Sequence, residues 1–242
     1  MSDTGVALVT GASGALGAAC AKVLDAKGYR LALHYTRNED AARKLAAELT
    51  NESVVVGADI GDWTEVSALA ERVAADLGAV SVLVNSGAIR RDGLMATQSV
   101  ADWAATIQVN LIGAFHVSRA VLPAMLRARW GRIINVVSPA GLIGSAGQTA
   151  YSAAKAGVMG MTRSLALECG RRKVTVNALS PGFMLTDLTE GVPDEVRASF
   201  ADRTPIRRFV TPDEVARGVE LLVDSAGITG QVLSIDGGLS IS

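Results

Sequence analysis

Short, almost continuously apolar runs alternate with longer helical patterns along most of the chain. Because a strand that is buried on both faces shows no polar alternation, the apolar runs predict strands of a parallel sheet. We expect these strands at Val6–Thr10, Arg30–His34, Ser53–Ala58, Ser81–Asn85, Arg132–Val137, Val174–Leu179 and Val232–Ile235. The helical patterns lie at Ala15–Ala26, Glu39–Leu49, Trp63–Leu77, Ala101–Arg127, Thr149–Cys169 and Pro212–Val223.

The repeated β-then-α order predicts one α/β domain over residues 1–242, a doubly wound parallel sheet of about seven strands with helices on both faces. No linker rich in Pro or Ser divides the chain. The segment Gly182–Val210 interrupts the rhythm with Pro193, Pro205 and several apolar residues. An insertion of this length is more often a functional flap than a plain connector, so we expect a substrate flap there. A surface excursion is the alternative.

Composition and charge exclude several classes of function. The net charge is −1 and the pI is about 6.1, so the chain has no general basicity for nucleic acid. The only cysteines and histidines show neither a metal-ligand spacing nor a disulfide framework; they are Cys20, Cys169, His34 and His116. We find no signal region and no apolar run near the ~18 residues of a membrane span, and therefore expect a cytoplasmic protein.

A glycine-rich turn, Thr10–Gly17, joins the first expected strand to the first expected helix. Unpaired N–H groups and the helix dipole at such a place attract a pyrophosphate. Gly11 permits the tight turn, and Gly17 lets the helix lie close to the strand. Glycines that merely end a strand are the alternative. The residues expected to contact a cofactor here are Gly11, Ser13, Ala15, Leu16 and Gly17.

The strongest chemical signal is Tyr151 and Lys155 in a helical pattern, with Ser138 at the end of the fifth expected strand. Residues four apart share one helix face, and the carboxyl edge of an open α/β sheet is where ligands bind. A nearby ammonium favours the phenolate and lowers the pKa of a tyrosine, which can then exchange protons near neutral pH. A serine hydroxyl can polarise a carbonyl. The three residues therefore predict reduction of a ketone.

These features resemble the short-chain dehydrogenase/reductase family, whose turn reads TGxxxGxG and whose catalytic pair reads YxxxK. The likeness runs from about Gly5 to Gly238 and implies a Rossmann-type fold. The chain departs from the turn pattern at Ala15, where the family carries glycine. The resemblance also implies that Asn110 is a fourth catalytic residue, which holds a water that connects the lysine to a proton relay.

The same resemblance implies a nicotinamide cofactor. NAD-specific relatives place an acidic residue at the end of the second strand, whereas this chain has Arg37 nearby, whose guanidinium suits a 2′-phosphate. We therefore expect NADP(H) rather than NAD; a solvated loop arginine is the alternative. The resemblance also implies that Asp59, at the end of the third expected strand, contacts the adenine; an Asp that caps the following turn is the alternative. The further cofactor contacts that the resemblance implies are Asp59, Ile60, Asn85, Gly87, Tyr151, Lys155, Pro181, Gly182 and Thr186.

Within the family the chain looks closest to the 3-oxoacyl-[acyl-carrier-protein] reductases, through Trp130–Asn135, Gly147–Tyr151 and Ile228–Gln231. This likeness implies NADPH-dependent reduction of a 3-oxoacyl thioester on an acyl carrier protein, in fatty-acid or polyketide-type biosynthesis. Arg129 and Arg172 match carrier-docking positions, although arginines at helix ends also serve the helix dipole. Two alternatives remain: a reductase of a small free ketone, sugar or aromatic polyketide, and a catalytically idle NADP(H)-sensing module.

Two of the expected helices, Ala101–Arg127 and Thr149–Cys169, are apolar nearly all round. A second apolar face on a helix indicates burial against a partner subunit, so we expect a homo-oligomer, and specifically a tetramer. Complete coverage within the monomer is the alternative.

Overall fold

A computed structural model describes residues 5–184, 195, 201–202 and 204–241, and the described strands form one seven-stranded sheet. Its spatial order is β3-β2-β1-β4-β5-β6-β7, and all neighbouring strands are parallel. The expected doubly wound sheet is therefore confirmed. The strands are β1 (Val6–Thr10), β2 (Arg30–Tyr35), β3 (Ser53–Gly57), β4 (Val80–Asn85), β5 (Gly131–Val136), β6 (Val174–Pro181) and β7 (Val232–Ile235).

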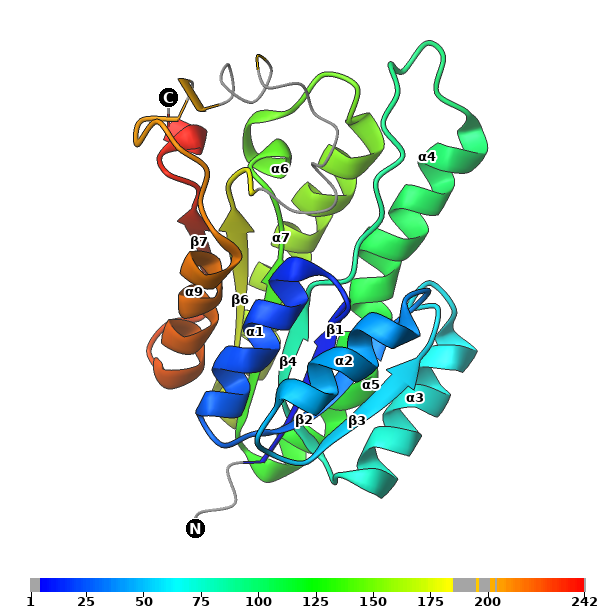
Figure 1. The fold of residues 1–242 in the computed structure, drawn as a ribbon, viewed down its shortest axis with the longest axis vertical. Helices are drawn as coiled ribbons and strands as arrows, with labels where there is room; N and C mark the ends of the chain where they lie inside the picture. The colour runs from blue at the N-terminus through cyan, green and yellow to red at the C-terminus, as the bar shows by residue number, and fades with distance from the viewer. Residues whose placement is uncertain (1–4, 185–194, 196–200, 203, 242) are drawn as a thin grey trace.

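Helices cover both faces of this sheet (Figure 1). One face carries α1 (Ala15–Ala26), α2 (Glu39–Glu48) and α9 (Pro212–Asp224). The other face carries α3 (Trp63–Asp76), α5 (Gly113–Ala128) and α7 (Thr149–Cys169). The shorter elements are α4 (Val100–Ile107), α6 (Ala140–Ile143), and the 3-10 turns η2 (Gly170–Arg172) and η4 (Leu239–Ile241).

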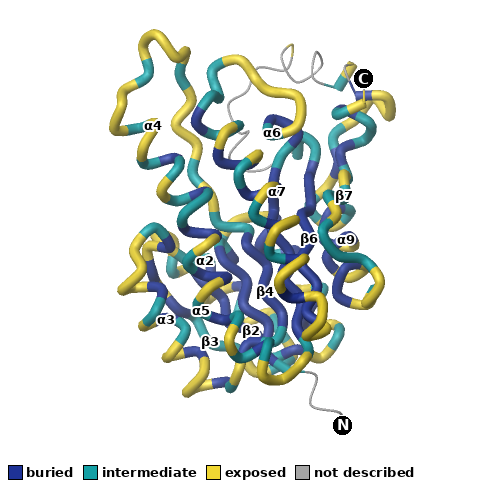
Figure 2. Tube along the Cα trace, turned by 180° about the vertical axis from the view of Figure 1, so that it is seen from behind, coloured by how far each residue is buried: buried dark blue, intermediate teal, exposed yellow. Residues whose placement is uncertain are grey.

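Both faces of β1 are buried, which explains its continuous apolar run. Ala7 and Val9 belong to the core under α1 and α9, whereas Val6 and Leu8 belong to the core under α3 and α5. Successive side chains of a strand point to opposite faces, so every position needs an apolar residue. Figure 2 shows the result as a buried central sheet within a shell of exposed helix surfaces.

The long helix expected at Ala101–Arg127 is present as one continuous helical stretch, Val100–Ala128, but it contains a π-helical turn that the sequence did not predict. The π-helical turn Gln108–Ile112 (η1) joins α4 to α5. A single π turn changes the hydrogen-bond step from four residues to five, and apolar periodicity over one turn does not distinguish the two. Such turns occur often at functional sites, and this one contains Asn110.

The continuous stretch Val100–Ala128 is long and apolar enough to cross a membrane by length and composition, because an 18-residue window within it has a mean hydropathy of 1.4. One such helix is weak evidence for a membrane span, because a helix in the core of a globular protein passes the same test. Here α5 packs against β4 and β5 and contacts α3 and α7. We therefore interpret the stretch as a helix of the core whose outer face is apolar.

The direction of the strand order reverses between β1 and β4, where open α/β sheets form their ligand crevice. Thr10, the last residue of β1, pairs with Asn85, the last of β4. The Thr10 hydroxyl accepts hydrogen bonds from the N–H groups of Ser86 and Gly87, each at 3.0 Å. The loops that follow the two strands are thus held side by side.

The expected flap, Gly182–Val210, lies largely outside the described residues.

Candidate active site

The glycine-rich turn after β1 adopts the close geometry that its sequence predicts. Gly11 has a φ of +66°, and a Cβ on Gly17 would lie 2.2 Å from the Gly11 carbonyl oxygen. Only glycine therefore lets α1 come so near to the turn. Within this described segment, no side chain caps the N-terminus of α1 and its first turn has no carboxylate. These N–H groups suit a pyrophosphate. Ser13 is half-buried, Ala15 is exposed, and Leu16 is buried.

Sequence reasoning missed His34, which supports this turn from β2. Its Nδ1 accepts a hydrogen bond from the Gly11 N–H at 3.2 Å, so its Nε2 donates to the Ala58 carbonyl at 2.9 Å. Burial lowers the pKa of His34, which agrees with this neutral form. The ring thereby fixes the glycine-rich turn to the ends of β2 and β3. In the sequence, His34 is only one more residue of an apolar strand.

The residues expected at the adenosine end of a dinucleotide lie beyond β2 and β3. Arg37 is exposed, and the sequence from Tyr35 to Asn38 has no acidic residue. Asp59 is also exposed, and its Oδ1 accepts a hydrogen bond from the Gly61 N–H at 2.8 Å, which is the capping contact considered as the alternative. Ile60 is buried, and its carbonyl oxygen lies 3.0 Å from the His116 ring.

Ser138, Tyr151 and Lys155 lie together at the carboxyl edge of the sheet. Ser138 follows β5, and the other two belong to the first turns of α7. Ser138 and Tyr151 line the same cavity, and the Ser138 hydroxyl acts to lower the pKa of the Tyr151 phenol. The Lys155 Nζ lies 5.5 Å from the centroid of the Tyr151 ring. The structure therefore brings together the three residues that the sequence selected.

The pKa of Tyr151 does not follow the expectation from the sequence, which was that a nearby ammonium lowers it. Burial raises the pKa of Tyr151, although the positive charge of Arg90 and the Ser138 hydroxyl act to lower it. Burial also lowers the pKa of Lys155 to about 8. The Lys155 ammonium donates to the Val136 carbonyl at 2.8 Å. In the chain by itself, burial thus outweighs the charges, and the lowered phenol pKa expected from the sequence is not found.

Asn110 fixes the loop that follows β4. Its Oδ1 accepts from the Ile89 N–H at 2.8 Å, and its Nδ2 donates to the Ile89 carbonyl at 2.9 Å. With Lys155, Asn110 lines a small cavity of about 10 Å³, which has room for one water. Both the oxygen and the nitrogen of the Asn110 side-chain amide are therefore hydrogen-bonded to the backbone of Ile89. The free acceptor in this cavity wall is the Oδ1 of Asn85, which has no hydrogen-bond partner among the described residues.

A buried chain of polar groups runs from β4 through β5 to α7. The Asn85 Nδ2 donates to the Asn135 Oδ1 at 2.8 Å, and the Asn135 Nδ2 donates to the Thr162 hydroxyl at 2.9 Å. Asn85 therefore aligns α7 with the sheet. Gly87 lies against the glycine-rich turn, because a Cβ on Gly11 would be 2.8 Å from its Cα.

Pro181 and Gly182 stand where β6 ends. The Gly182 N–H donates to the Ile235 carbonyl at 2.9 Å, and a Cβ on Gly182 would lie 2.7 Å from the Cα of Asp236. Glycine is therefore required for this close approach of two loops. Thr186, which the family likeness adds to this segment, lies outside the described residues.

A cavity of about 600 Å³ opens beside the Ser138 and Tyr151 hydroxyls. Its size suits a small organic substrate, and few polar groups converge on its catalytic end. The apolar part of its wall includes Val137, Pro139, Ile143, Phe183, Met184 and Leu239. The arrangement can hold an apolar chain while it presents a carbonyl to a serine and a tyrosine.

The fold and this site define an oxidoreductase that acts on the CH–OH/C=O pair: a glycine-rich turn lies at the switch point, and a serine, tyrosine and lysine lie beside an apolar cavity. The family model described as short chain dehydrogenase matches residues 5–197. The chain belongs to that family.

The chain is also similar over nearly its whole length to individual proteins. Nodulation protein G of Rhizobium sp. (strain N33) is 42% identical over 97% of this chain and 96% of its own length. The 3-oxoacyl-[acyl-carrier-protein] reductase of Synechocystis sp. (strain ATCC 27184 / PCC 6803 / Kazusa) is 41% identical over 97% and 96%. The 3-oxoacyl-[acyl-carrier-protein] reductase FabG of Staphylococcus aureus (strain Mu50 / ATCC 700699) is 36% identical over 99% of both chains.

The two arginines expected to dock a carrier lie at the opposite edge of the sheet. Arg129 follows α5 and precedes β5, and Arg172 ends η2 just before β6. Ser138 follows the other end of β5, and six residues of strand span roughly 20 Å. Both arginines are exposed, and Arg129 donates to the Arg171 carbonyl at 3.2 Å.

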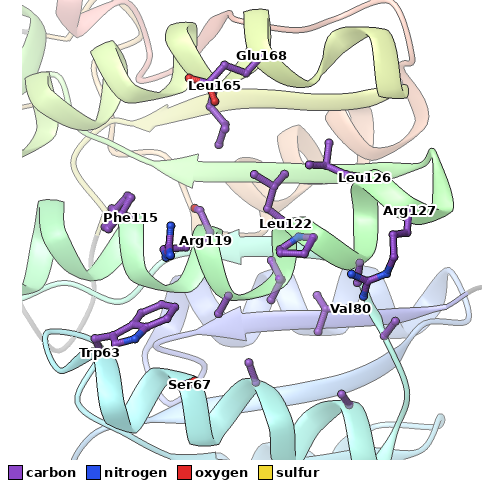
Figure 3. A pocket seen from close by; sticks show the side chains of 18 of the residues that line it. Trp63, Ser67, Val80, Phe115, Arg119, Leu122, Leu126, Arg127, Leu165 and Glu168 are labelled. Atoms are coloured by element: carbon purple, nitrogen blue, oxygen red, sulfur yellow. The ribbon is translucent and has the colours of Figure 1, made fainter.

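A larger groove of about 860 Å³ lies away from the catalytic residues, on the outer face of α3, α5 and α7 (Figure 3). Its lining is mainly apolar and includes Trp63, Phe115, Leu122, Leu126 and Leu165. Two of these large side chains are well exposed: 40% of Trp63 and 47% of Phe115. The apolar outer face that the sequence indicated for the two long helices is therefore present on this surface.

Proposed function

We propose that the chain is an NADPH-dependent reductase that converts a 3-oxoacyl thioester on an acyl carrier protein to the 3-hydroxyacyl form. The observation that carries this proposal is that Ser138 and Tyr151 stand together in the wall of an apolar cavity, with the Lys155 Nζ 5.5 Å from the centroid of the Tyr151 ring. Two relatives that bear the name of this activity support the choice of substrate.

In this proposal, each polar group at the cavity has one task. The Ser138 hydroxyl donates a hydrogen bond to the substrate carbonyl and polarises it. The Tyr151 hydroxyl gives its proton to the carbonyl oxygen. The Lys155 ammonium stabilises the phenolate that remains. Asn110 holds the loop beside them. NADPH, when bound, supplies the hydride that the carbonyl carbon receives.

The cofactor would lie along the switch point. The N–H groups after Gly11 and at the start of α1 would hold its pyrophosphate, and Arg37 would pair with its 2′-phosphate. Asp59 would face the adenine, while Pro181 and Gly182 would border the nicotinamide. We propose that Thr186, in the segment after Gly182, also contacts the cofactor.

The test compares NADPH with NADH, and a short carrier-bound 3-oxoacyl thioester with free ketones and sugars. We expect turnover of the thioester with NADPH. Fast reduction of a free ketone without turnover of the thioester would replace this proposal with the small-ketone reductase. Tight binding of NADPH without any turnover would favour the idle sensing module.

Arg129 and Arg172 lie at the edge of the sheet opposite to Ser138, Tyr151 and Lys155 of the same chain. A carrier bound to these arginines would therefore deliver its substrate to the site of a second subunit. We propose a homo-oligomer, specifically a tetramer, in which the groove beside Phe115 is covered by another copy. Replacing both arginines by Ala should raise KM for the carrier-bound thioester and leave KM for the thioester without its carrier unchanged. Equal KM values for the variant and the original chain with the carrier substrate would remove this docking role.

A further inference from the structure

Arg90 stands in the wall of the substrate cavity, together with Ser138 and Tyr151. Its guanidinium carbon lies 5.9 Å from the centroid of the Tyr151 ring. The Lys155 Nζ lies 5.5 Å from the same centroid. Two positive charges from different parts of the chain therefore lie within about 6 Å of one phenol, the range in which a cation interacts with an aromatic ring.

A network of hydrogen bonds holds this guanidinium in place. Arg90 pairs with Asp92, and the Gln148 Nε2 donates to the same carboxylate oxygen of Asp92 at 3.0 Å. Gln148 directly precedes α7, the helix that carries Tyr151. The Gly93 N–H also donates to the Gly147 carbonyl at 2.8 Å. The loop after β4 is thus fastened to the start of the catalytic helix, so Arg90 keeps its position relative to the ring.

Four groups of the described residues face the Tyr151 hydroxyl or ring. They are Lys155 on α7, Arg90 and Asp92 on the loop after β4, and the Ser138 hydroxyl after β5. Burial raises the pKa of Tyr151, the charge of Arg90 lowers it, Ser138 lowers it, and Asp92 raises it. Arg90 is therefore the strongest influence that opposes burial, and Asp92 only partly cancels it.

We propose that Arg90 is a positioning residue that acts through Tyr151, because it holds a second positive charge over the phenol and thereby favours loss of the phenolic proton to the substrate oxygen. The proposal rests on the proposed function for the direction of the chemistry. The O–H bond of Tyr151 breaks, a new O–H bond forms on the substrate oxygen, and the phenolate that remains interacts with both Arg90 and Lys155.

The first test uses the oxidative direction, with the 3-hydroxyacyl thioester and oxidised dinucleotide. The phenolate is the active form there, so the rate rises with pH as Tyr151 loses its proton. Arg90→Gln should move this rise to higher pH and lower the rate on the rising limb about threefold, as expected for loss of a unit charge about 6 Å from the centre of the ring in a water-like dielectric. Arg90→Lys should restore the original profile.

The neighbouring Arg91 provides a matched control. It pairs with Asp102 and does not line the cavity, so Arg91→Gln removes the same charge and should leave the profile in place. Asp92→Asn removes the opposing negative charge, keeps an amide oxygen for Arg90, and should move the rise to lower pH. If neither Arg90→Gln nor Asp92→Asn moves the profile, the proposal is wrong. A change in KM alone would also overturn it, because Arg90 would then contact substrate directly.

A second measurement does not depend on the substrate. The chain has three tyrosines, Tyr29, Tyr35 and Tyr151, so tyrosinate absorbance with oxidised dinucleotide bound can be corrected with a Tyr151→Phe variant. The difference isolates the titration of Tyr151. Arg90→Gln should shift it to higher pH, and an unchanged titration would refute the role of Arg90. Failure of thioester turnover, in contrast, would affect only the proposed function.

Discussion

The buried ammonium of Lys155 should destabilise the cofactor-free chain in a way that depends on pH. Lys155 is only 3% exposed, and burial lowers its pKa from the usual 10.5 to about 8. Between these two values the unfolded chain binds more protons than the folded chain. The free energy of unfolding therefore rises with pH, because the folded protein releases a proton from Lys155 that is costly to bury.

The difference between these two pKa values gives the size of the effect. At pH 7 the buried ammonium costs the folded chain about 3 kcal/mol, since each pH unit of pKa difference corresponds to about 1.4 kcal/mol. At pH 9 the cost falls to about 2 kcal/mol, because most of the folded molecules then hold a neutral amine. Lys155→Met removes the charge but also loses the hydrogen bond to the Val136 carbonyl, which is worth about 1 kcal/mol at either pH.

Urea unfolding of the cofactor-free protein at pH 7 and pH 9 measures this directly. Lys155→Met should be more stable than the original chain by about 2 kcal/mol at pH 7, and the advantage should shrink by about 1 kcal/mol at pH 9. The same variant should lose its reductase rate. Lys44→Met, at an exposed lysine, is the control and should show no such change. An advantage that stays constant or grows with pH would refute the reasoning.

Three further substitutions test other parts of the structure. Gly17→Ala should cost about 1–3 kcal/mol and weaken binding of the dinucleotide, because the added Cβ meets the Gly11 carbonyl oxygen; thermal unfolding and a binding titration measure both. Arg37→Glu should raise KM for NADPH about tenfold or more and leave KM for NADH much less affected, since a carboxylate repels a 2′-phosphate. Phe115→Glu should place a charge in the groove of Figure 3 and reduce the particle size in solution scattering, whereas an unchanged size would argue against an interface there.

The sheet was predictable because its strands are buried on both faces. Such strands leave runs of Val, Ile and Leu that no helix period explains, and the structure matches each run within one or two residues. The spacing of Tyr151 and Lys155 and the place of Ser138 after a strand were also sufficient to bring these residues together. The short helix Ala140–Ile143 and the π turn at Gln108–Ile112 left no comparable signal, because one turn is shorter than the period that would reveal it.

The electrostatics of the site could not be predicted, because they depend on contacts that are distant along the chain. Asp92 and Gln148 are separated by 56 positions, yet they meet beside the catalytic tyrosine and hold Arg90 there. Sequence reasoning named a lysine that lowers the phenol pKa, but it could not weigh that charge against burial, which acts in the opposite direction. A raised pKa keeps Tyr151 protonated in the resting chain. The phenol is then ready to donate a proton, which suits the reductive direction, and the positive charges of Lys155 and Arg90 become important only as that proton leaves.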